Sequence, residues 1–202
     1  MATPTSSKAI PIKTFKVLGT TGAVAITRRL QEKATQTFKI GTPVMVEVAS
    51  GYLIENPAIT DVASAVIAGL AQEPGHDLTT SAVPKTLTYG SVQNQPSAVL
   101  IPVGAPPSDG LCGVDIAADD MVFQGVLGSS VDNPTGVVAQ TDLGSIFGLT
   151  KDPGNSYWYV DKSKTTAATG ACVEITDFID IVGTVNGKVG FKFTHAAQQM
   201  SL

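Results

Sequence analysis

The chain has 202 residues, of which 43% are hydrophobic and 15% charged, with a formal net charge of −4. This composition supplies a packed core and argues against disorder as a description of the whole chain. No apolar run reaches the roughly 18 residues of a membrane helix, and the 20 glycines and 12 prolines leave little room for long helices.

Bases are concentrated at the front of the chain. Residues 1–40 contain seven bases and one acid, a net charge of +6, whereas residues 41–202 carry −10. We therefore expect an extended basic arm over residues 1–18 and a β-rich body over residues 19–202. The basic segment is either solvated or docked on the chain itself, or it contacts another protein or a neighbouring copy. The bases we predict for such a contact are Lys8, Lys13, Lys16, Arg28 and Arg29.

Other partners and compartments are disfavoured by the same features. The acidic body would repel phosphate, so no nucleic-acid partner is expected, and no membrane partner is expected either. The first residues lack the apolar segment of a secretory signal, so we expect synthesis in a cytoplasm.

Short apolar or alternating segments separated by turn residues predict strands along the body. In chain order they cover residues 15–18, 44–48, 52–55, 65–71, 86–89, 98–103, 111–116, 121–127, 157–160, 173–181 and 188–194. The last two are expected to form a hairpin through Asn186-Gly187. Alternation in the final strand places Val189, Phe191 and Phe193 on one face.

One short helix is expected over residues 141–147, with Thr141 as its N-cap and Gly148 as its stop. The pattern as a whole predicts an all-β fold, a sandwich or barrel of about ten short strands. The body is one unit or two small β subdomains with a break near residue 133. The sequence shows no clean internal repeat.

Residues able to support catalysis or to bind a metal are few and scattered: His76, Cys112, Asp115, Asp119, Asp120, Cys172 and His195. They match no nucleophile or metal-ligand spacing, so no catalytic residue, metal site or cofactor is expected. The two cysteines are predicted to be buried free thiols, and the acids at 115–120 a solvated turn. We expect a protein that is not an enzyme.

An aromatic cluster offers one binding hypothesis. In Tyr157-Trp158-Tyr159, strand alternation places Trp158 in the core and the two tyrosines on the opposite face. The tyrosines could line a surface between proteins or form the platform of a carbohydrate-binding module.

Several turn-and-strand phrases resemble the capsid decoration, or cement, proteins of tailed bacteriophages. The likeness covers roughly residues 38–200, and the phrases are Gly41-Thr42-Pro43-Val44, Gly51-Tyr52-Leu53-Ile54, 66–78, 89–96, 101–106, 147–152 and 157–161.

This resemblance implies a β-rich virion protein that binds the outer face of the capsid and clamps neighbouring subunits of the major capsid protein. It also implies a homo-oligomer, with a trimer suited to local threefold sites, located on the virion after synthesis in the host cytoplasm. An N-terminal arm that reaches a neighbour is a recurrent device in such proteins. A tail or baseplate component is the alternative within the same class.

Overall fold

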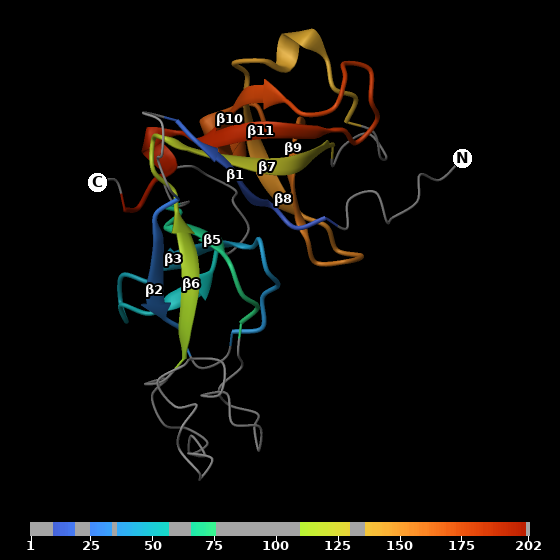
Figure 1. Cartoon of the computed structure of the whole chain (residues 1–202). Coiled ribbons are helices and arrows are strands. Elements are labelled where there is room, and N and C mark those ends of the chain that lie inside the picture. Colours follow the sequence, from blue (N-terminus) through green and yellow to red (C-terminus); the bar gives the residue numbers. More distant parts are fainter. Residues whose placement is uncertain are drawn as a thin grey trace.

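The computed structural model describes residues 10–18, 25–33, 36–56, 66–75, 110–129 and 136–200. Within these ranges the chain is built of strands and three single-turn 3₁₀ helices (Figure 1). The all-β expectation is confirmed. The strands are β1 (Lys13–Val17), β2 (Thr27–Gln31), β3 (Pro43–Val46), β4 (Leu53–Glu55), β5 (Gly69–Ala71), β6 (Leu111–Ile116), β7 (Met121–Gly128), β8 (Ile146–Lys151), β9 (Trp158–Asp161), β10 (Ala171–Phe178) and β11 (Lys188–Phe193).

The strands form two sheets that pack against each other. One sheet has the order β2-β6-β5-β3-β4 and the other the order β1-β7-β11-β10-β8-β9. Between Ile116 and Met121 the chain passes from β6 of the smaller sheet to β7 of the larger one. The break expected near residue 133 lies outside the described residues.

Each sheet also curls until its ends meet. In the larger sheet β9 pairs in parallel with the second half of β7, which closes the strands β7 to β11 into the barrel we call the second barrel. In the smaller sheet a parallel bridge joins Glu32, just after β2, to Leu53 of β4. This bridge closes β2 to β6 into the first barrel.

The two barrels share one topology, which is a repeat that the sequence did not predict. Counted in chain order, the five strands are β2 to β6 in the first barrel and β7 to β11 in the second. In each barrel the first strand pairs with the fifth, the fifth with the fourth, the fourth with the second and the second with the third, all antiparallel. The third then meets the first in parallel. The fifth strands also share a pattern of glycines and apolar residues, Gly110-Leu111-Cys112-Gly113-Val114-Asp115-Ile116 and Gly187-Lys188-Val189-Gly190-Phe191-Lys192-Phe193.

The second strand of each barrel begins after a glycine with positive φ. Gly41 has φ 78° before β3, and Gly144 has φ 76° before β8. Such a conformation is easy for glycine and strained for other residues. The helix expected over residues 141–147 is wrong. A 3₁₀ turn at Gln140–Asp142 leads into the turn at Gly144, and the residues that follow form β8, which pairs with β10.

The second barrel holds the main aromatic core. Phe123, Phe191 and Phe193 are fully buried, and their ring centroids are 5.4 to 6.1 Å apart. The predicted inward face of β11 and the β10–β11 pairing are thus confirmed. The connection between these strands runs from Ile179 to Gly187, so Asn186-Gly187 does not form a two-residue turn.

The front of the chain belongs to the body from Ile12 onwards. Ile12 is buried in the core of the second barrel, and β1 pairs antiparallel with the first half of β7. A Cβ on Gly41 of the first barrel would lie 2.4 Å from the Ile12 carbonyl oxygen, so the backbone at Ile12 packs directly against the backbone of Gly41. Residues 1–9 of the expected arm lie outside the described residues.

Candidate partner-contact surface

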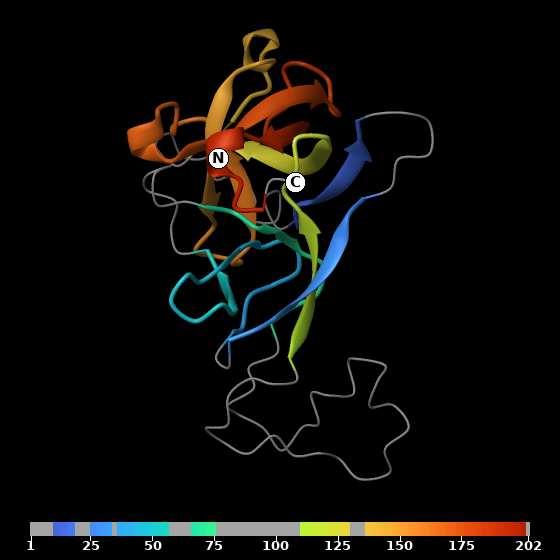
Figure 2. The ribbon, with the colours of Figure 1, turned by 90° about the vertical axis from the view of Figure 1, so that its left-hand side faces the viewer.

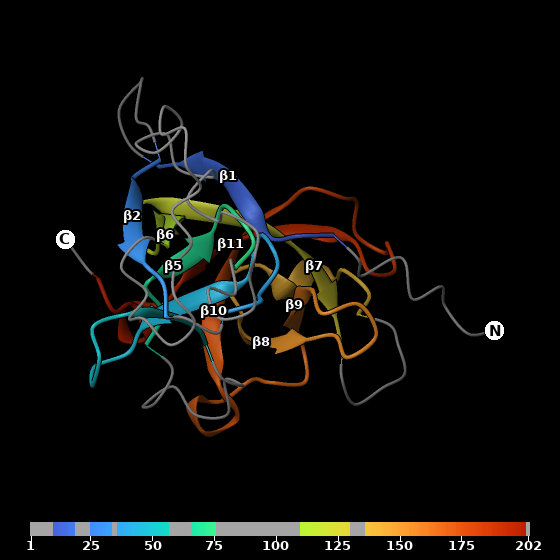
Figure 3. The same cartoon turned by 90° about the horizontal axis from the view of Figure 1, so that it is seen from below.

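The bases predicted to contact a partner have different environments. Lys13 is exposed at the start of β1, and Arg28 and Arg29 are exposed on β2. Figures 2 and 3 show these two strands on the same side of the molecule. Arg28 and Arg29 are consecutive in a strand, so their side chains point to opposite faces. Lys8 lies outside the described residues.

Lys16 is engaged within the chain. Its Nζ donates to Asp177 Oδ1 on β10 at 2.6 Å. Gly190 of β11 leaves room for the Asp177 side chain, because a Cβ at position 190 would lie 3.0 Å from the Asp177 Cβ. Partial burial raises the pKa of Asp177, but hydrogen bonds from Lys16 and Thr176 outweigh it and the pKa is lowered.

This ion pair makes a prediction about pH. A lowered pKa in the folded state stabilises the fold above the unfolded value near 4, and the stabilisation is lost as the pH falls through the folded pKa. Lys16→Met is expected to lower the free energy of unfolding by about 0.5–1 kcal/mol at pH 7. The difference from wild type, measured by urea unfolding across pH, should shrink below about pH 4.

Lys13→Met on the same strand is the matched control, because Lys13 is exposed. It should change stability little at any pH. A Lys16→Met deficit that stays constant down to pH 2 would show that the effect does not come from the Asp177 carboxylate.

Asp115 joins β1, β2 and β6 at one buried carboxylate. Thr14 of β1 and Thr27 of β2 both donate their hydroxyls to it, the latter at 2.6 Å, and Gln72 Nε2 donates at 2.8 Å. Asp115 is only 5% exposed. The expected solvated turn is therefore wrong for this residue, because the side chain accepts hydrogen bonds from strands of both sheets. Asp119, in contrast, has a side chain that is 75% exposed.

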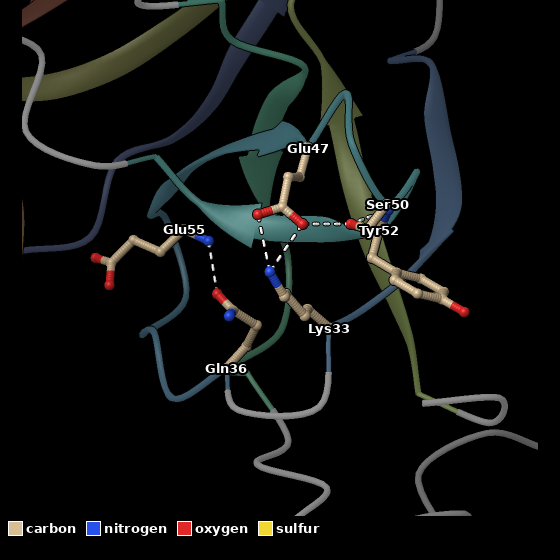
Figure 4. A network of polar contacts seen from close by, with 6 residues as sticks. All are labelled: Lys33, Gln36, Glu47, Ser50, Tyr52 and Glu55. Carbon is tan, nitrogen blue, oxygen red and sulfur yellow. Dashed lines mark hydrogen bonds and ion pairs between the residues drawn. The ribbon is translucent and has the colours of Figure 1, made fainter. Parts of the chain in front are cut away.

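A second polar network holds the chain just beyond the end of β2 (Figure 4). Lys33 Nζ lies 2.8 Å from each carboxylate oxygen of Glu47, and Ser50 Oγ donates to the same carboxylate. These hydrogen bonds lower the pKa of Glu47. The Glu55 backbone N–H donates to Gln36 Oε1 at 2.7 Å. These hydrogen bonds thus connect the β3–β4 hairpin to the chain just after β2, next to the Glu32–Leu53 bridge that closes the first barrel.

Both cysteines are free and buried, as predicted. Burial is the main cause that raises the pKa of Cys112, and it raises the pKa of Cys172 to about 12. Both thiols are therefore protonated at neutral pH, and a protonated thiol is a weak nucleophile.

The tyrosine platform is not formed as predicted. Trp158 is buried, as expected, but Tyr159 is also buried, at 4% exposure. Burial raises the pKa of Tyr159. Tyr157 lies under Lys39, whose Nζ is 4.6 Å from its ring centroid. The two rings therefore do not offer a shared open face to a sugar.

The remaining candidate residues do not assemble into a site. His195 is exposed, with Nδ1 3.8 Å from the Asp119 carboxylate. His76 lies outside the described residues. In the described ranges, no three His, Cys, Asp or Glu side chains gather as metal ligands would. Nor does any helix within those ranges have the length and apolar character to cross a bilayer.

One exposed apolar cluster was not predicted from the sequence. The β10–β11 connection carries Ile181, Val182 and Val185 at its surface, and Val137 forms a bridge with Val185. Ile181 is 82% exposed. Three aliphatic residues between positions 181 and 185 were a usable signal, but an Asn-Gly turn was expected in this connection.

Comparison with known proteins identifies no relative. No family model, no curated protein and no solved structure matches the chain.

Proposed function

We propose that the protein is a non-enzymatic virion structural protein that binds the outside of a phage capsid and stabilises it by clamping neighbouring capsid subunits. Its partners are the major capsid protein and other copies of itself. The observation that carries the proposal is the exposure of Lys13, Arg28 and Arg29 on two strands at the side of the molecule. Exposed bases of this kind suit contact with an acidic protein surface.

The acids of the body support the same proposal. Asp142 is buried and binds Lys162 at 2.8 Å, and Asp161 is buried and accepts hydrogen bonds from Thr150 and Ser163. Together with Asp115, these acids stabilise the fold through internal contacts. Asp142 is thereby paired with Lys162 inside the second barrel, away from the exposed bases of β1 and β2.

The architecture also suits a decoration role. Two closed barrels form a stiff body, and many weak contacts between neighbours on a shell add up through avidity. A tail or baseplate component would use the same body, and the number of copies per particle separates the two roles.

Binding to undecorated heads tests the proposal. Wild-type protein should co-sediment with heads, and a variant lacking residues 1–9 with Lys13→Glu should bind about tenfold or more weakly, since charge complementarity is lost. This deletion keeps the buried Ile12, whose removal would damage the core. Gln140→Glu, an exposed position on the second barrel, is the control for added negative charge.

Two results would contradict the proposal. Wild-type protein that stays in the supernatant at every concentration would overturn capsid binding itself. Undiminished binding by the truncated Lys13→Glu variant would overturn the role assigned to the basic front of the chain.

A further inference from the structure

The β3–β4 and β8–β9 hairpins contain equivalent turns. Each hairpin joins the second strand of its barrel to the third, and the connections are residues 47–52 and residues 152–157. Each connection begins with an acidic residue and ends with a tyrosine. The two turns can therefore be compared position by position.

The hydrogen bonds of the two turns match. In each, the N–H of the first residue donates to the carbonyl of the last, and the N–H of the fifth donates to the carbonyl of the first. The tyrosine N–H donates to the side chain of the fourth residue, which is Ser50 in one turn and Asn155 in the other. The fifth residue has positive φ in both, 74° at Gly51 and 62° at Ser156. The backbone that carries the fourth carbonyl and the tyrosine is thus the same in both turns.

The second of these turns binds a lysine of the first barrel. Lys39 Nζ donates to the Asn155 carbonyl at 2.6 Å and lies 4.6 Å from the centroid of the Tyr157 ring. The carbonyl accepts a hydrogen bond from the ammonium, and the face of the ring attracts its charge. We call these two groups, the carbonyl of the fourth residue and the ring of the last, the lysine cradle.

The cradle of the first turn consists of the Ser50 carbonyl and the Tyr52 ring. Within the described residues no cation lies over the Tyr52 ring and no donor bonds to the Ser50 carbonyl. Figure 4 shows the Tyr52 ring directed away from Lys33, which forms its ion pair with Glu47. The fourth and fifth residues are exposed in this turn and half-buried in the other. The first turn therefore presents to the outside what the second presents to Lys39.

Charge points to a lysine of a second copy as the occupant. The cradle lies in the part of the chain with a net charge of −10, whereas residues 1–40 carry +6. Three of the four described lysines in residues 1–40 have a partner within the chain; they are Lys16, Lys33 and Lys39. The fourth, Lys13, is exposed at the start of β1.

We propose that the Ser50 carbonyl and the Tyr52 ring of one copy bind the Lys13 ammonium of a second copy. The contact would form between chains what Lys39 and the second turn form within one chain. Because its two halves lie on different parts of the chain, each copy can give one lysine and accept another. One such contact is weak, and many of them on a shell would reinforce one another. The inference rests on the proposed function for the meeting of copies, but it can be tested on the protein alone.

A lysine over an aromatic ring has a signature in NMR spectra. The ring current of the tyrosine shifts the lysine Hε protons upfield. Lys39 should show this shift at every protein concentration, because its tyrosine belongs to the same chain. Lys13 should show it in wild-type protein only at about millimolar concentration, since a single contact of this kind is weak.

Complementary variants test whether the contact joins two chains. Lysine-labelled Tyr52→Leu protein keeps Lys13 but lacks the ring, so its Lys13 signal should not be shifted. Addition of unlabelled Lys13→Met protein, which keeps the ring and brings no competing Lys13, should restore the upfield shift in a saturable way. Lys39 should remain shifted in Tyr52→Leu, which shows that the variant is folded.

Two further variants control for the ring. Unlabelled protein with both Lys13→Met and Tyr52→Leu offers no ring at position 52 and should restore no shift. Tyr52→Phe keeps an aromatic face and should bind Lys13 about as well as wild type, whereas Tyr52→Leu should bind it about fivefold or more weakly.

Three results would overturn the inference. The first is the absence of a restored Lys13 shift at millimolar protein. The second is an equal shift from the single and the double unlabelled variants. The third is a restored shift at Lys8 in place of Lys13, because the occupant would then be a different base.

Head binding separates this inference from the proposed function. If the mixed variants restore the Lys13 shift but the protein does not bind heads, the capsid role fails and the contact between copies stands. If the protein binds heads and the mixed variants give no shift, the contact fails and the capsid role stands.

Discussion

Replacing Phe191 with alanine is expected to lower the free energy of unfolding by about 3–5 kcal/mol. Phe191 is fully buried on β11, and its ring packs edge-on against Phe193 at 5.8 Å and tilted against Phe123 at 6.1 Å. The substitution leaves a cavity among rigid strands that cannot collapse to fill it. Equilibrium unfolding in urea, followed by tryptophan fluorescence, measures the loss.

Ile181→Ala is the matched control, because this aliphatic residue lies on the connection preceding β11 and is 82% exposed. It should change the free energy of unfolding by less than about 0.5 kcal/mol. A Phe191→Ala loss as small as that of the control would contradict the aromatic core described for the second barrel.

Replacing Asp115 with alanine is expected to lower the free energy of unfolding by about 3 kcal/mol, because three donors lose a buried charged acceptor. The donors come from Thr14, Thr27 and Gln72, so the loss spans both barrels. Amide hydrogen exchange should also become faster in β1, which loses its polar anchor on the first barrel. Denaturant unfolding and exchange mass spectrometry measure the two effects.

Asp119→Ala removes a largely exposed carboxylate from the segment that links β6 to β7. Its expected cost is below about 1 kcal/mol, with unchanged exchange in β1. Equal losses for the two substitutions would show that Asp115 has no special role in joining the barrels.

Local sequence patterns predicted the strands well where one face is buried. Alternation in Lys188–Phe193 correctly placed its aromatic residues inside, and the apolar run of Leu111–Ile116 is a buried strand. These patterns follow from the two-residue period of a strand against a core. The predicted all-β class rests on them.

Pairings between distant strands could not be predicted in the same way. The bridge from Glu32 to Leu53 depends on how a whole sheet curls, and local alternation carries no information about that. The expected helix failed for a related reason, because pairing of β8 with β10 overrides a plausible N-cap at Thr141. The repeat was visible in the two fifth-strand patterns but is short, so it became clear only through the topology.

Single polar residues were the hardest to place. Tyr159 was expected at the surface by alternation with Trp158, but all four residues of β9 are buried, so both of its faces are covered. Asp115 was expected in a solvated turn, but donors more than 40 residues away in sequence converge on it. Neither outcome follows from nearest neighbours in the chain.

For the candidate surface, the sequence predicted the basic residues but not their different environments. Lys16 is tied to Asp177, whereas Lys13 and Arg28 are exposed. Charge counting cannot separate these cases, because the ion pair joins residues 161 positions apart in sequence.

The copy number of this chain in purified particles tests the central claim most directly. Quantitative mass spectrometry would measure it against the major capsid protein. A decoration protein should be present in hundreds of copies, near a simple ratio to the capsid subunit. A few copies to a few dozen would contradict a shell-wide role and assign the protein to the tail or a vertex, and complete absence from particles would contradict the virion function itself.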